Sequence, residues 1–179
     1  RTIESFYKWS GGGRIPIFCD TTSCTHTLLF ETGGDILTPE NWEKYKQLKI
    51  MDITQWLKEV VLPRIKVIRP KNRILLHPTC SCQIMGLTPV LLDIARKCAR
   101  EVILPDNWGC CGASGDRGFI FPELSDSATR DERDEIGHES FDGCYSLART
   151  CEIAMQDHIE QPYESIVYLV DETIQDQGT

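Results

Sequence analysis

Short, continuous apolar runs alternate along the chain with segments that place an apolar residue every three or four positions. The runs at 15–19, 73–77 and 101–104 predict buried β-strands. A helix is predicted from Thr88, with the threonine as N-cap and proline in its first turn; its apolar face is Leu91, Ile94, Ala95 and Cys98. Buried strands that alternate with amphipathic helices predict an α/β fold with three layers, in which helices flank a largely parallel sheet.

Two parts of the chain have similar sequence patterns. A hydroxyl residue precedes Cys24 and another precedes Cys151, 127 residues later, and each cysteine opens a predicted helix. Asp52 and Ser165, 113 residues apart, can each cap a helix that has apolar residues at the same five positions. An insertion at 31–44 accounts for the difference between the two offsets. The pattern predicts two pseudo-repeated halves, of which the first is truncated at its beginning.

Composition and charge exclude several classes of function. The chain of 179 residues has 27 acidic and 19 basic side chains and a net charge of −8, which disfavours nucleic acid as a partner. The longest apolar stretch, 166–170, is far shorter than the roughly 20 residues that cross a bilayer, so no transmembrane segment is expected. Neither a Gly-x-Gly-x-x-Gly motif nor a phosphate-binding loop is present. The chain begins at Arg1 rather than methionine, as expected for a piece of a longer protein.

Nine cysteines are more than a domain of this length needs for folding. Their number is odd and Cys110 and Cys111 are adjacent, which argues against a disulfide framework and for a reducing compartment. Cys98 lies on an apolar helix face and Cys19 ends an apolar run, so both are predicted to fill the core.

Five of the other cysteines are expected where loops meet helices. Cys80 and Cys82 follow the strand predicted at 73–77, and glycines flank Cys110 and Cys111 after the strand at 101–104. Cys151 opens a helical segment. Helix N-termini favour the thiolate form of cysteine, and glycines allow a backbone to approach an inorganic group closely. Cys144 lies in a poorly periodic segment, where partial burial and metal ligation both stay open.

The spacing of these cysteines resembles that of the cysteine-rich, or CCG, domain family. Cys80 is followed after 29 residues by Cys-Cys-Gly at 110–112 and after 38 more by Cys151. Family members include the cysteine-rich subunit of heterodisulfide reductase, the iron-sulfur subunit of glycolate oxidase, and the C-terminal part of large FAD-linked D-2-hydroxyacid dehydrogenases. The chain is most similar to the last group, through ungapped motifs at 14–17, 20–25, 110–119, 121–124, 149–152 and 162–171.

The resemblance implies a division of the chain and a metal centre. Residues 1–68 correspond to the C-terminal part of a first cysteine-rich half, and 69–179 to a complete second half. The metal ligands would be Cys80, Cys110, Cys111 and Cys151, the number that a [4Fe-4S] cluster takes. Cys24 falls on the closing position of the first half. The alanine at position 148 departs from the family's final Cys-x-x-Cys, so a cluster with five ligands would need Cys82 or Cys144 as a substitute.

The resemblance also implies the function of the parent protein. In it, FAD and ferredoxin-like domains upstream of this chain would oxidise a D-2-hydroxyacid, such as D-lactate or D-2-hydroxyglutarate, to the 2-oxoacid. Electrons would leave through clusters toward a quinone or another acceptor rather than NAD. No catalytic residue and no FAD-binding residue is expected in this chain. The implied location is cytoplasmic, with peripheral association at the inner membrane as an alternative.

Other functions stay open. Four thiolates also suit zinc, although the short Cys-x-x-Cys pairs of structural zinc sites are absent, and zinc can replace a cluster that is lost in the isolated domain. A metal-free module that docks subunits and a thiol-disulfide activity like that of heterodisulfide reductase are further alternatives. His77 is expected behind the ligands rather than as a ligand. The acidic run 126–139 is predicted to be a solvated helix face, with Arg130 and Arg133 as ion-pair partners.

Overall fold

The computed structural model describes residues 1–174, so the last five residues of the predicted second half lie outside the described residues. Its main sheet has four parallel strands in the order β4–β3–β5–β6. The strands are β3 (Lys71–Leu76), β4 (Ala99–Ile103), β5 (Gly143–Ser146) and β6 (Tyr163–Ser165). The predicted strands at 73–77 and 101–104 are therefore confirmed within two residues, whereas β5 and β6 were not predicted.

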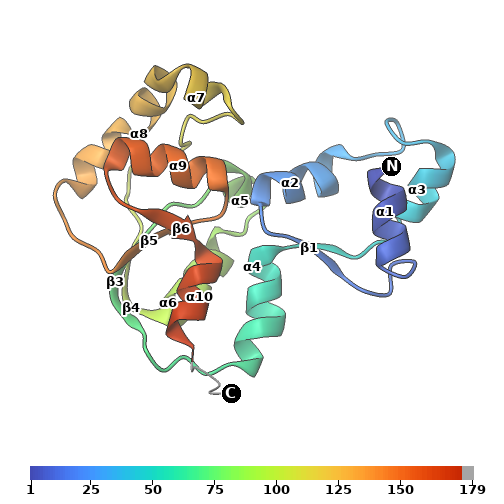
Figure 1. Cartoon of the computed structure of the whole chain (residues 1–179), viewed down its shortest axis with the longest axis horizontal. Helices are drawn as coiled ribbons and strands as arrows, with labels where there is room; N and C mark the ends of the chain where they lie inside the picture. Colours follow the sequence, from blue (N-terminus) through green and yellow to red (C-terminus); the bar gives the residue numbers. More distant parts are fainter. Residues whose placement is uncertain (175–179) are drawn as a thin grey trace.

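The side chains of the central strands alternate between two apolar cores. Ile74 and Leu76 point into a core formed with α6 (Thr88–Cys98) and α10 (Ile166–Thr173). Leu75 points into the opposite core, which includes residues of α8 (Pro122–Ile136) and α9 (Arg149–Ile159). Figure 1 shows α8 and α9 on one side of the sheet and α6 and α10 on the other. The predicted α/β fold, a parallel sheet flanked by helices, is confirmed.

Two of the three helix N-caps predicted from the sequence are confirmed. Asp52 caps α4 (Ile53–Trp56) in a capping box with Gln55, and Ser165 caps α10 by accepting a hydrogen bond from the Val167 amide. The prediction for Thr88 is wrong, because α6 begins after Leu87 and Thr88 lies inside the helix. The Thr88 hydroxyl lies 4.0 Å from the Cys82 sulfur instead of capping the helix.

The first part of the chain forms a smaller parallel pair, β1 (Ile17–Cys19) and β2 (Ile50–Asp52). Cys19 pairs with Asp52, and in the large sheet Ser146 pairs with Ser165. Cys19 and Ser146 are 127 positions apart, which is also the distance in sequence between Cys24 and Cys151. Asp52 and Ser165, the two helix caps, are 113 positions apart. The two βα segments therefore have the same strand register, as expected of related halves.

The remaining elements surround these two sheets. The first part of the chain contains α1 (Thr2–Trp9), α2 (Thr22–His26), which continues as η1 (Thr27–Glu31), and α3 (Pro39–Tyr45). After β2, α4 continues through η2 (Leu57–Val61) and η3 (Leu62–Arg64). The later part adds α5 (Cys80–Ile84) and α7 (Arg117–Ile120). None of the helices in residues 1–174 is long and apolar enough to cross a membrane.

A chain of hydroxyl groups joins the two parts where α2 lies beside α5 (Figure 1). The Thr22 hydroxyl donates to the Leu147 carbonyl over 3.1 Å, and the Thr79 hydroxyl donates to that of Thr22 over 3.3 Å. Both hydroxyls are buried, so each bond replaces one that water would otherwise make. The start of α2 is thereby fixed next to the loop that precedes Cys80.

Candidate metal centre

The four cysteines of the predicted metal centre come from three loops at one edge of the main sheet. Cys80 begins α5 after β3, Cys110 and Cys111 lie in the loop after β4, and Cys151 is in the first turn of α9 after β5. Because these strands are parallel, the loops that follow them meet at the carboxyl edge, where α/β sheets usually bind ligands. The fold thus explains why cysteines so far apart in the sequence can converge.

The four thiols form one contiguous group that extends from the surface into the core. The Cys111 and Cys151 sulfurs are 3.0 Å apart, and both side chains are largely buried. Cys80 and Cys110 are exposed, and the side chains of Cys80, Cys110 and Cys111 lie close enough to affect one another's pKa. The Gly112 amide donates to the Cys110 sulfur over 3.4 Å.

The surroundings of Cys80, Cys110 and Cys111 favour the protonated form of these three thiols. The hydrogen bond with Cys111, together with burial, raises the pKa of Cys110 far above its ordinary value. For Cys111, the hydrogen bond with Cys110 lowers the pKa, but the bond with Cys151 and burial outweigh it and raise the pKa to about 12. Burial also raises the pKa of Cys80. Metal binding at this site would therefore have to release protons.

The donor type fits a thiophilic metal or an iron-sulfur cluster, because four sulfurs converge. Among residues 1–174, however, no three His, Cys, Asp or Glu side chains are already arranged around a common metal position. Sulfurs on a tetrahedral zinc ion with bonds of about 2.3 Å lie roughly 3.8 Å apart. Since Cys111 and Cys151 are at 3.0 Å, a metal or cluster would have to separate these thiols.

Gly112 determines the path of the cysteine loop. Its φ is +72°, and a Cβ there would lie 2.6 Å from the Leu124 carbonyl oxygen and 2.8 Å from the Ser125 Cα. Both contacts are with backbone at the start of α8, so they cannot be relieved by a rotamer change. The loop therefore packs closely against α8 only because this residue has no side chain.

We expect Gly112→Ala to lower the free energy of unfolding by about 2 kcal/mol, because of the left-handed φ and the clash with α8. Chemical denaturation measures this loss. Gly115→Ala is the matched control, because Gly115 also has positive φ (+74°) but no atom near its Cβ position. Equal losses in the two variants would contradict the role given to the contact with α8.

Glu135 anchors the beginning of the same loop. Its carboxylate accepts hydrogen bonds from the Asp106 amide at 2.7 Å and the Asn107 amide at 2.8 Å. The amide of Asn107, followed by that of Asp106, lowers the pKa of Glu135 below its ordinary value. The loop after β4 therefore contacts α8 at two places: its start is hydrogen-bonded to Glu135, and Gly112 packs against the first turn of the helix.

We expect Glu135→Gln to reduce stability at neutral pH, and the difference from the wild type to disappear in acid. A lowered pKa in the folded state gives stability that is present above the unfolded-state pKa of about 4.3 and is lost as pH falls through the folded value. Denaturation at pH 7 and at about pH 3 measures the difference. A deficit of the same size at both pH values would exclude the proposed cause.

The other five cysteines differ in burial and in their position relative to this group. Cys98 is fully buried, as predicted, and Cys82 is fully buried in the same core, where burial raises its pKa to about 12. Cys144 is buried in β5 and shares the opposite core with Cys111 and Cys151. Cys24 is exposed on α2, and Cys19 is half-buried rather than a full member of a core.

One buried pair behind the cysteines was not predicted from the sequence. The His77 Nδ1 lies 3.0 Å from a carboxylate oxygen of Glu132, and the two residues are 0 % and 1 % exposed. The interpretation of 126–139 as a fully solvated face is therefore wrong at Glu132, which points toward the sheet. His77 directly follows β3, three residues before Cys80, and its place behind the proposed ligands stays a prediction. Arg130 pairs with Asp126 at the i,i+4 spacing that was predicted, whereas Arg133 pairs with the same carboxylate from seven residues away.

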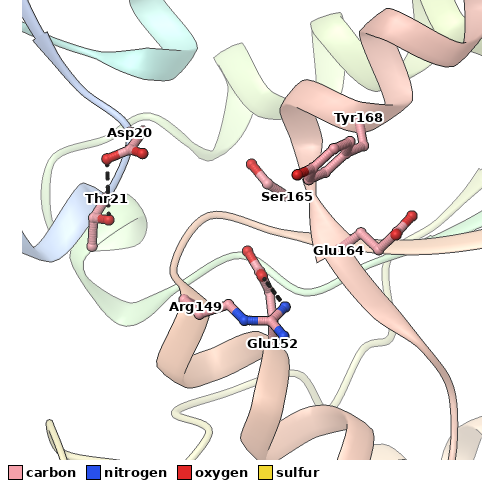
Figure 2. A pocket seen from close by; sticks show the side chains of 7 residues that line it. All are labelled: Asp20, Thr21, Arg149, Glu152, Glu164, Ser165 and Tyr168. Carbon is pink, nitrogen blue, oxygen red and sulfur yellow. Dashed lines mark hydrogen bonds and ion pairs between the residues drawn. The ribbon is translucent and has the colours of Figure 1, made fainter.

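A polar pocket of about 360 Å³ lies beside the first turn of α9 (Figure 2). Its lining comes from both parts of the chain: Asp20, Thr21, Arg149, Glu152, Glu164, Ser165 and Tyr168. Burial raises the pKa of Glu152, although its ion pair with Arg149, at 3.1 Å, acts in the opposite direction. Because the lining residues lie after β1, after β5, in β6 and in α10, only the folded chain brings them together.

Comparison with protein-family models gives no match for this chain, and comparison with curated proteins gives none either. The resemblance to the cysteine-rich domain family therefore remains a prediction from sequence motifs. The geometry of the four thiols stands independently of that resemblance.

Proposed function

We propose that this chain is an electron-transfer domain that holds a [4Fe-4S] cluster on Cys80, Cys110, Cys111 and Cys151. The observation that carries the proposal is the convergence of these four thiols from three loops at the carboxyl edge of a parallel sheet. A core packing role alone gives no reason for two of the four, Cys80 and Cys110, to be exposed.

The cluster supplies one-electron transfer at a potential that its protein surroundings adjust. The exposed side of the site, at Cys80 and Cys110, is where a redox partner can come closest. The Gly112 amide, which donates to the Cys110 sulfur, is placed to stabilise negative charge on that thiolate. Cys111 and Cys151 attach the site to the core between the sheet and α9.

We further propose that the parent protein is an FAD-linked D-2-hydroxyacid dehydrogenase of the D-lactate or D-2-hydroxyglutarate type. Hydride would pass to FAD in an upstream domain, and electrons would leave through this chain toward a quinone or another acceptor. The division into halves at 1–68 and 69–179 is supported by the common register of the β1–β2 and β5–β6 pairs. A cytoplasmic location, with peripheral attachment at the inner membrane, belongs to the same proposal.

Anaerobic reconstitution with iron and sulfide tests the cluster. We expect uptake of about four iron atoms per chain and a broad absorbance band at about 400 nm that bleaches on reduction. A chain that folds but takes up no iron would contradict the proposal. Sequencing of the residues upstream of Arg1 in the parent gene tests the second part, through the presence or absence of flavin and ferredoxin-like domains.

Zinc is the second candidate, and the compactness of the thiol group favours it. The 3.0 Å between the Cys111 and Cys151 sulfurs is closer to the spacing around one metal ion than to that around a larger cluster. Tight uptake of one zinc ion, with no iron uptake under reducing conditions, would indicate a structural site in a docking module. Turnover of a disulfide substrate by the reconstituted protein would instead favour the thiol-disulfide alternative.

A further inference from the structure

The loop that carries Cys110 and Cys111 leads directly into an exposed apolar ridge, which consists of Phe119, Ile120, Phe121 and Leu124. Phe119 and Ile120 belong to α7, Phe121 lies between α7 and α8, and Leu124 is in the first turn of α8; they are 48 %, 64 %, 48 % and 43 % exposed. Figure 1 shows α7 at the upper edge of the molecule. Single exposed apolar residues are common, but four within six positions form a continuous patch of the kind that marks an interaction site.

A hollow of about 190 Å³ lies beside the ridge, between α7, α8 and α9. Phe119 and Pro122 give it an apolar wall, and Ser125 and Asp157 add oxygen acceptors. The Ser125 hydroxyl oxygen is buried and has no hydrogen-bond partner within residues 1–174, and the exposed Asp157 forms no ion pair there. An apolar wall with acceptors beside it suits the aliphatic stem and cationic head of a lysine or arginine side chain.

The charges around the ridge indicate the same kind of partner. Glu123 adjoins the ridge in sequence, and Asp131 and Asp134 lie further along α8; all three are exposed and form no ion pair with any other described residue. The cations of these helices are Arg117 on α7 and Arg130 and Arg133 on α8, and the last two pair with Asp126. The whole chain has a net charge of −8. A surface with unpaired carboxylates on a chain of this net charge attracts a basic protein surface and is repelled by the anionic lipids of a membrane.

We propose that the ridge and its hollow form a docking surface for a protein whose contact face has an apolar centre ringed by lysine and arginine side chains. One of these cationic side chains inserts into the hollow and reaches Asp157 and Ser125. Because Gly112 packs directly on the backbone of Leu124 and Ser125, a partner on the ridge lies next to the exposed Cys110. This proposal goes beyond the proposed cluster, and the docking itself does not require metal.

Titration with cytochrome c, a small basic protein whose exposed haem edge is apolar and ringed by lysines, tests the surface. At about 20 mM salt we expect amide shifts in ¹⁵N-labelled protein confined to 117–125 and 154–158, and a Kd that rises several-fold at about 200 mM salt. Ile120→Ser and Asp157→Asn should each weaken binding about tenfold. Both change exposed side chains, so the fold should be retained, which circular dichroism checks.

Matched controls are Trp9→Ser, an exposed apolar residue on α1, and Asp171→Asn, an exposed carboxylate on α10. These should change Kd by less than about twofold. Absence of binding, equal weakening by the controls, or shifts confined to other acidic surfaces would each overturn the proposal. So would binding to anionic phosphatidylserine vesicles that Ile120→Ser abolishes. Since the titration uses metal-free protein, its result is independent of whether iron is taken up.

Discussion

Cys111→Ser is expected to abolish uptake of iron and sulfide by the folded domain. Cys111 lies in the middle of the group, in contact with Cys110 on one side and 3.0 Å from Cys151 on the other. A serine hydroxyl is a poor ligand for iron in a cluster, and three thiolates at this position would hold a cluster only weakly. The measurement is iron content per chain after anaerobic reconstitution, together with the absorbance at about 400 nm.

The control for this experiment is Cys19→Ser. Cys19 is half-buried at the end of β1 and is not one of the proposed ligands, so this variant should take up as much iron as the wild type. Thermal unfolding of each metal-free variant separates loss of ligation from loss of folding. Equal iron uptake by Cys111→Ser and the wild type would rule out the four-cysteine site.

His77→Ala is expected to lower the free energy of unfolding by about 3–5 kcal/mol, more than either Gly112→Ala or Glu135→Gln. His77 and Glu132 are both buried, and the imidazole Nδ1 lies 3.0 Å from the carboxylate. Removal of the imidazole leaves the carboxylate buried without this partner, which costs far more than loss of an exposed ion pair. Urea denaturation at pH 7 measures the loss.

Two further variants make the cause of this loss identifiable. Glu123→Gln, on the exposed side of the same helix, should change stability by less than about 0.5 kcal/mol. The double variant His77→Phe with Glu132→Leu should regain a large part of the loss, because no unpaired charge then remains in the core. If His77→Ala costs less than about 1 kcal/mol, the pair does not have the role in stability assigned to it.

The fold could be predicted in outline because local patterns encode it. Asp52 and Ser165 cap their helices as predicted, and the apolar face of α6 with Cys98 is buried as its spacing requires. The strands β5 and β6 were missed because each has only three or four residues and includes polar positions such as Ser146 and Glu164. Their strand structure depends on pairing with neighbours far away in the sequence.

The sequence by itself determined the alternation of strands and helices, the glycine that lets the cysteine loop turn, and the positions of the cysteines after strands. These depend on residue spacing and on conformational preferences that act over a few residues. Only the tertiary structure decided that Cys111 contacts Cys151, that Glu132 turns inward to His77, and that the residues of α7 remain uncovered. The physical reason is that such contacts join segments 30 to 70 residues apart, and local preferences do not specify them.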